Sequence, residues 1–112
     1  MKETLLVKHA VGGRTFIDTG KRPMEYEVAK TGDGWKFDIH IQPDADVQEL
    51  LRWKDELNVF LFQEAEGEPT KKIWFYVSGG PVEYDAPSRR LTIAAKSRIE
   101  YVPDRFGSGR SY

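Results

Sequence analysis

The chain has 112 residues, which is enough for one domain and too few for two. Lysine and arginine total 17 and aspartate and glutamate 18, so the net charge of −1 excludes a uniformly basic nucleic-acid coat and an acidic disordered tail. The absence of cysteine excludes disulfides, thiolate catalysis and cysteine-ligated metal sites. With no long apolar run and no signal-like N-terminus, the expected location is cytoplasmic, without membrane contact.

The first half of the chain is predicted to form two hairpins. Apolar side chains alternate over residues 4–11, with His9 on the apolar side, and the glycine pair at 12–13 offers a two-residue turn into a short strand over 14–18. We interpret His9 as a half-buried core residue rather than a metal ligand, because the chain has only two histidines.

The second hairpin joins two alternating segments, 24–29 and 35–42. Asp33-Gly34 between them is the strongest short-range signal for a type I′ turn. With these two residues as the loop, Glu27 faces His40; with Gly32-Asp33 as the loop, Glu27 faces Asp38. Both registers keep the apolar face intact, so charge pairing favours the first.

One helix is predicted over residues 44–57. Pro43 ends the preceding strand, and either Asp44 or Asp46 is suited to be the N-cap. If Asp46 is the cap, Glu49 three residues later completes a capping box. The leucines and valine of this segment follow the spacing of one apolar helical face.

The second half of the chain is predicted to be strand again. Residues 57–62 and 73–77 are apolar at both parities, which is typical of central strands covered on both faces. A third hairpin is expected from 82–85 and 90–96, and 99–102 is a candidate last strand. The fold class is therefore mostly β, α+β: an antiparallel sandwich or partly open barrel of about eight strands, with the helix between two β-halves. Residues 1–102 form the domain, and 103–112 are expected to be a flexible tail.

The best candidates for a catalytic or metal cluster are Glu27, Asp38 and His40. A histidine held by a carboxylate is suited to general base catalysis, and two carboxylates with a histidine suit a divalent metal. A solvent-exposed strand with paired charges explains the same three residues more simply. No other segment supplies a nucleophile or a second ligand set, so we expect no metal, no cofactor and no enzymatic activity.

Charge asymmetry is the more informative signal. Residues 88–112 contain six basic and two acidic residues, and the rest of the chain is acidic. If the strand is regular through residue 98, its outer face carries a stripe of cations that continues into the tail. The candidate partner-binding residues are Arg90, Lys96, Arg98, Arg105 and Arg110. Cations that protect an exposed edge strand are the simpler explanation, and the acidic remainder disfavours nucleic acid.

Three functional hypotheses follow from these patterns. The first is a non-catalytic binding or assembly module that acts through protein–protein contacts with a protein partner or as a homo-oligomer, such as a small accessory or structural protein of a phage or mobile element. The second is a barrel that binds a small or anionic ligand, or nucleic acid, with Trp35, Trp74 or Tyr76 on its walls. The third is a hydrolase or metal-dependent enzyme centred on Glu27, Asp38 and His40.

Overall fold

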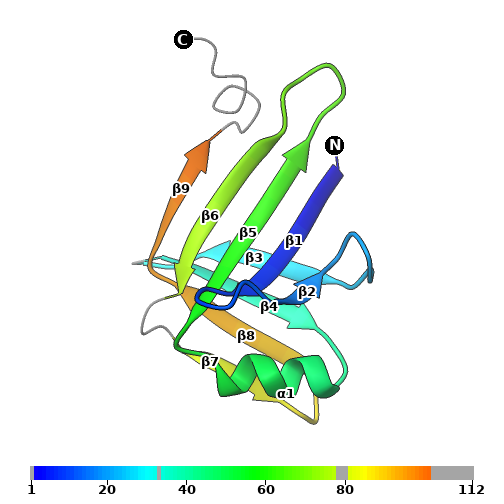
Figure 1. The fold of residues 1–112 in the computed structure, drawn as a ribbon, viewed down its shortest axis with the longest axis vertical. Coiled ribbons are helices and arrows are strands. Elements are labelled where there is room, and N and C mark those ends of the chain that lie inside the picture. The colour runs from blue at the N-terminus through cyan, green and yellow to red at the C-terminus, as the bar shows by residue number, and fades with distance from the viewer. Residues whose placement is uncertain (1, 33, 78–80, 102–112) are drawn as a thin grey trace.

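The computed structural model describes residues 2–32, 34–77 and 81–101, which form two antiparallel sheets and one helix (Figure 1). The five-stranded sheet contains, in spatial order, β2 (Thr15–Asp18), β1 (Lys2–His9), β5 (Leu57–Glu64), β6 (Lys71–Val77) and β9 (Ser97–Tyr101). The four-stranded sheet contains β3 (Tyr26–Lys30), β4 (Trp35–His40), β8 (Arg90–Ala95) and β7 (Val82–Asp85).

The two sheets face each other as a sandwich, and alternate residues of each strand supply the core. The largest fully buried side chains come from both sheets and the helix, and include Phe37, Ile39, Leu50, Phe75 and Ile93. The rings of Phe37 and Phe75 meet edge to face across the sandwich, with centroids 4.8 Å apart and planes at 87°. The predicted α+β sandwich is confirmed, and the sheets do not close into a barrel.

The chain changes sheets between β8 and β9. β8 ends at Ala95, the backbone N–H of Lys96 donates to the carbonyl of Tyr76, and β9 then pairs with β6 in the other sheet. Such a corner is a common way of joining the sheets of a sandwich. The condition for a cation stripe, one regular strand through Arg98, is therefore not met, and the two separate strands predicted over 90–96 and 99–102 correspond to β8 and β9. β8 lies between β4 and β7, whereas β9, which carries Arg98, is an edge strand of the five-stranded sheet.

Helix α1 (Ala45–Arg52) lies at one end of the sandwich and contacts β2 and β7 (Figure 1). It is shorter than the predicted 44–57, because Leu57 begins β5, where it pairs with His9 and Val77. Its N-cap is Asp44, whose side chain accepts from the Val47 N–H, so the capping box built on Asp46 does not form. No helix of the described residues is long and apolar enough to cross a membrane.

The β3–β4 hairpin has the second of the two predicted registers rather than the favoured one. Glu27 faces Asp38 and Lys30 faces Trp35, while the Thr31 N–H donates to the carbonyl of Gly34. The repulsion between Glu27 and Asp38 does not decide the register, because Asp38 accepts a hydrogen bond from Thr92 at 3.0 Å and lies 3.9 Å from Lys36 Nζ. The prediction considered β3 and β4 alone and missed these partners.

The first hairpin also turns earlier than predicted. β1 ends at His9, whose N–H donates to the carbonyl of Arg14, and Gly13 adopts a φ of 74°. The loop therefore has four residues, and Val11, expected on the apolar side of the strand, is 78% exposed. The third hairpin forms where predicted, with β7 and β8 joined by a turn that places Arg89 at a φ of 55°.

Candidate functional site

The outer face of the five-stranded sheet carries a group of apolar side chains that no other described strand or helix buries. β5 and β6 are central strands as predicted, but only their inward-facing residues are fully buried. The outward-facing ones are half-buried, and Ile99 of β9 is 48% exposed. We call this group the aromatic face, and it consists of Leu6, Phe60, Phe62, Trp74, Tyr76 and Ile99.

The strand register aligns the aromatic face into a continuous row across four strands. Leu6 pairs with Phe60, Phe60 with Trp74, and Trp74 with Ile99. We call these four residues the central row. Trp74 also packs against Tyr76 two residues along β6, with ring centroids 4.6 Å apart and planes at 32°. Phe60 and Trp74 are 5.7 Å apart at 31°. The rings therefore contact one another rather than standing separately.

Lysines flank the central row on both sides. Lys72 Nζ lies 4.6 Å from the ring centroid of Phe60 and 5.4 Å from that of Phe62, so its ammonium occupies one side of both rings. On the other side of the row, Lys8 lies opposite Asn58, which pairs with Tyr76. The face therefore combines an apolar centre with a charged margin, which also contains Asp18 opposite Leu6 and Glu64 opposite Lys2.

Trp74 has a polar group that the surrounding residues leave unsatisfied. Its indole Nε1 is buried and has no hydrogen-bond acceptor among the described residues. Native cores seldom leave a buried N–H in this state. The sequence did not reveal this face. A strand whose odd and even residues are all apolar is normally interpreted as buried on both faces, but the same pattern arises when one face is an uncovered aromatic surface.

Comparison with known proteins finds no matching family model, no matching curated protein and no matching solved structure.

The structure places the predicted acid–base cluster on one polar face of the β3–β4 hairpin. Glu27 and Asp38 are cross-strand partners, and the backbone N–H of His40 donates to the carbonyl of Glu25. Asp38 accepts a hydrogen bond from Thr92 and forms an ion pair with Lys36, while the side chains of Glu27 and His40 are exposed. Within residues 2–32, 34–77 and 81–101, no group of three or more potential ligands is arranged to hold a metal ion.

The structure does not bring the predicted cations together. Arg90 lies on β8 of the four-stranded sheet and Lys96 lies at the corner, whereas Arg98 lies on β9 of the other sheet. Arg98 is 2.9 Å from Glu100 and stacks over Trp35, with its Cζ 4.8 Å from the ring centroid. Arg105 and Arg110 lie outside the described residues, as does the predicted flexible tail.

His9 is a packed structural residue, as predicted. Its ring stacks on Trp53 with centroids 4.9 Å apart, Nδ1 accepts from the Gly12 N–H, and Nε2 is 3.0 Å from Glu56 Oε1. Both ring nitrogens are therefore occupied by protein groups. Of the aromatic residues proposed for the wall of a pocket, Trp35 lines a hollow between the sheets, whereas Trp74 belongs to the aromatic face.

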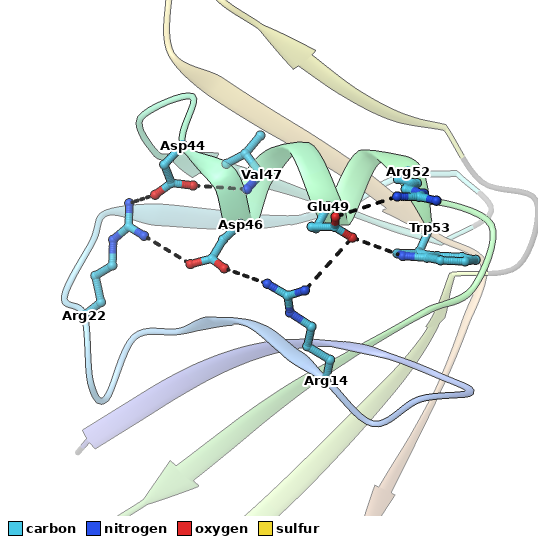
Figure 2. A network of polar contacts seen from close by, with 8 residues as sticks. All are labelled: Arg14, Arg22, Asp44, Asp46, Val47, Glu49, Arg52 and Trp53. Atoms are coloured by element: carbon cyan, nitrogen blue, oxygen red, sulfur yellow. Dashed lines mark hydrogen bonds and ion pairs between the residues drawn. The ribbon is translucent and has the colours of Figure 1, made fainter.

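A polar network ties helix α1 to the loops around β2 (Figure 2). Arg22 Nη2 is 2.6 Å from Asp44 Oδ2, and its other terminal nitrogen is 3.8 Å from Asp46. Arg14 bridges Asp46 at 3.4 Å and Glu49 at 4.0 Å. These exposed pairs are worth little individually. Together they link helix α1 to the segments before and after β2.

Asp44 gives this network a measurable pH dependence. Burial raises the pKa of its carboxyl, but the Val47 N–H, the Arg22 guanidinium and the Asp46 N–H together hold the pKa below its ordinary value. A carboxyl with a lowered folded-state pKa contributes stability above its unfolded pKa of about 3.9 and loses it as the pH falls through the folded value. We expect Asp44→Ala to lower the free energy of unfolding by about 1 kcal/mol at pH 7, and by less under acid conditions, as measured by urea denaturation.

Asp44→Asn is the matched control, because asparagine caps a helix about as well as aspartate but carries no charge. It should retain most of the stability that alanine loses and should remove the pH dependence due to this group. If Asp44→Ala lowered the free energy of unfolding equally at pH 7 and at pH 3, the ionised carboxylate would not be the stabilising group.

Proposed function

We propose that this protein is a non-catalytic assembly module that binds a second copy of itself through the aromatic face. The observation that carries the proposal is the central row, which runs uninterrupted across β1, β5, β6 and β9. A contiguous apolar patch rimmed by charged residues is typical of a protein–protein interface.

The size of the face supports a weak dimer. Four strands about 4.8 Å apart, with about six residues per strand at about 3.3 Å, give a surface of roughly 380 Å² per copy and roughly 760 Å² for a pair. Interfaces below about 1,200 Å² are those of weak, transient contacts, so this area fits only a weak dimer. We therefore expect a dissociation constant on the order of 10 μM or weaker.

The lysines on the face are compatible with self-association, whereas Asp18, which pairs with Leu6 at the β2 end of the row, meets its own copy near the axis. A twofold axis that runs along the central row reverses the strand direction in the second copy. Each residue on one side of the row therefore meets a residue from the opposite side of the row in the second copy. Lys72 then meets Tyr76 of the second copy, and Lys8 meets Thr4. Lysines do not face lysines in this arrangement, and each Lys72 gains a ring to contact.

The ring contacts favour a protein over single-stranded nucleic acid. Bases stack on aromatic side chains whose ring faces are free. Here Lys72 already covers one side of Phe60 and Phe62, and Trp74 packs against both Phe60 and Tyr76. An apolar protein surface can instead pack on the outward edges of these rings.

The test is the molar mass in solution as a function of concentration, measured by sedimentation equilibrium. The wild-type mass should rise from the monomer value of 12.9 kDa toward twice that value as the concentration increases through the micromolar range. Ile99→Lys should weaken dimerisation at least about tenfold, because it places a charge on the central row. Its stability should change little, because Ile99 is half exposed.

Val11→Lys is the matched control, since Val11 is also an exposed aliphatic side chain but lies in the β1–β2 loop, away from the aromatic face. It should dimerise like the wild type. A wild-type protein that remains monomeric at millimolar concentration, or an Ile99→Lys variant that dimerises like the wild type, would overturn the proposal.

A further inference from the structure

A second surface feature, a groove between the two sheets, lies on the opposite side of the five-stranded sheet from the aromatic face. The five-stranded sheet extends beyond the edge strand β3 (Figure 1), so the inward-facing residues of β3 do not close fully onto it. Val28 is only half-buried and Lys30 is exposed, although both face the sandwich interior. The resulting hollow has a volume of about 420 Å³, within the range of small-molecule sites.

The floor and one wall of the groove are apolar. Leu61, Ile73 and Phe75 of the five-stranded sheet form the floor and are almost fully buried. Trp35 of β4 forms the wall, with its ring 5.7 Å from that of Phe75 and nearly perpendicular to it. Because the floor residues are almost fully buried, Trp35 and the half-buried Val28 provide most of the apolar area that the body of a ligand can contact.

One end of the groove is cationic. Lys30 Nζ lies 4.6 Å from the ring centroid of Trp35, and Arg98 Cζ lies 4.8 Å from the same centroid. Glu100 is 2.9 Å from Arg98, whereas Lys30 has no carboxylate within 4 Å among the described residues. Glu100 also pairs with Lys71 at 3.3 Å, so it does not neutralise both Lys30 and Arg98, and positive charge is in excess beside Trp35.

The other end of the groove is acidic, which disfavours an anion there. Glu3 accepts a hydrogen bond from the Tyr26 hydroxyl at 2.6 Å and from the Gln63 amide at 2.8 Å. Burial and the neighbouring Glu3 carboxylate both raise the pKa of Tyr26, so its hydroxyl keeps its proton. Glu3 on β1 and Arg98 on β9 are three strand spacings apart across the sheet, about 14 Å, and four residues apart along it, about 13 Å. The groove is thus polarised along its length.

We propose that this groove binds a small amphipathic anion, with its apolar body on Trp35 and Val28 and its acidic head at Lys30 and Arg98. Arginine has five N–H donors in a planar fork, so Arg98 can bind Glu100 and a ligand head group at the same time. Carboxylate and phosphate heads share this chemistry. This site is independent of the aromatic face, and neither proposal requires the other.

The test uses four ligands with the same ten-carbon chain: decanoate, decyl phosphate, decanol and decylamine. Isothermal titration calorimetry should show binding of one or both anions and much weaker binding of decanol and decylamine. The stronger of the two anions identifies the head group. Failure of both anions to bind at millimolar concentration, or equal binding of decanoate and decanol, would overturn the proposal.

Two variants locate the head group. Lys30→Gln and Arg98→Gln should each weaken anion binding about tenfold, because each removes a charge-assisted hydrogen bond. Arg98→Lys should recover part of the loss, and Lys30→Gln should fold normally because Lys30 is exposed. Arg90→Gln is the matched control, an exposed cation on β8 outside the groove, and should bind like the wild type. Anion binding that survives both glutamine substitutions unchanged would place the ligand elsewhere.

Discussion

Phe75→Ala should lower the free energy of unfolding by about 4 kcal/mol, a large part of the roughly 5–15 kcal/mol of a domain of this size. Phe75 is 1% exposed and lies at the centre of the five-stranded sheet on β6. Its ring meets Phe37 at 4.8 Å and Trp35 at 5.7 Å, both close to edge-to-face. Truncation therefore removes buried apolar area, leaves a cavity and breaks two ring pairs that join the sheets. Urea denaturation monitored by circular dichroism measures the loss.

Phe62→Ala is the matched control, because Phe62 is the same residue type on the neighbouring strand but points to the outer face. It is half-buried in the monomer, so its truncation should cost no more than about 2 kcal/mol. Equal losses for the two variants would mean that the inner and outer faces of this sheet are buried alike. That result would contradict both the sandwich and the uncovered aromatic face.

The order and type of the elements could be predicted from the sequence because alternation is a local signal. Strands paired through a short turn, such as β7 with β8, need only their own residues to specify which side is buried. The helix begins where Pro43 and Asp44 predicted a boundary. Its end was predicted less well, because Leu57 satisfies the helical spacing and the β5 pattern equally, and long-range pairing with His9 and Val77 decides between them.

Register and sheet membership could not be predicted, because both depend on partners distant in the sequence. Asp38 tolerates Glu27 opposite it since Thr92, 54 residues away, supplies a hydrogen bond. The predicted row of cations along one strand does not form for a similar reason. The chain turns a corner at Lys96, so Arg98 lies in the other sheet. A periodic pattern describes one strand and gives no information about where a strand changes sheets.

The candidate surfaces were missed for a related reason. The sequence shows that Phe60 and Trp74 are apolar but does not show whether a helix covers them, and α1 lies instead at the end of the sandwich. The groove depends on how far the five-stranded sheet extends beyond β3, which no local pattern encodes. Trp35, which the sequence suggested as a wall residue of a ligand-binding barrel, lines this hollow between the sheets, and its cationic neighbours Lys30 and Arg98 come from two other strands.

Gly34→Ala should destabilise the protein by about 3 kcal/mol. Gly34 lies between the β3–β4 turn and β4, and a β-carbon at this position would be 2.0 Å from the carbonyl oxygen of Ala95 and 3.0 Å from the Lys96 Cα. These are backbone atoms of the corner between β8 and β9, so no side-chain rotation relieves the clash. The corner or β4 must move, which disturbs the Trp35–Ala95 pair and the junction of the two sheets.

Gly32→Ala is the matched control for this substitution, since Gly32 lies in the same turn and an added β-carbon there has no atom within 4 Å. It should change the free energy of unfolding by no more than about 0.5 kcal/mol. The pair of variants separates two roles of glycine in a hairpin, because only Gly34 is required for close backbone approach. This requirement also accounts for the observed register: with Gly34 against β8, the hydrogen bond from the Thr31 N–H to the Gly34 carbonyl closes the hairpin. Equal tolerance of alanine at both positions would remove the steric basis for that register.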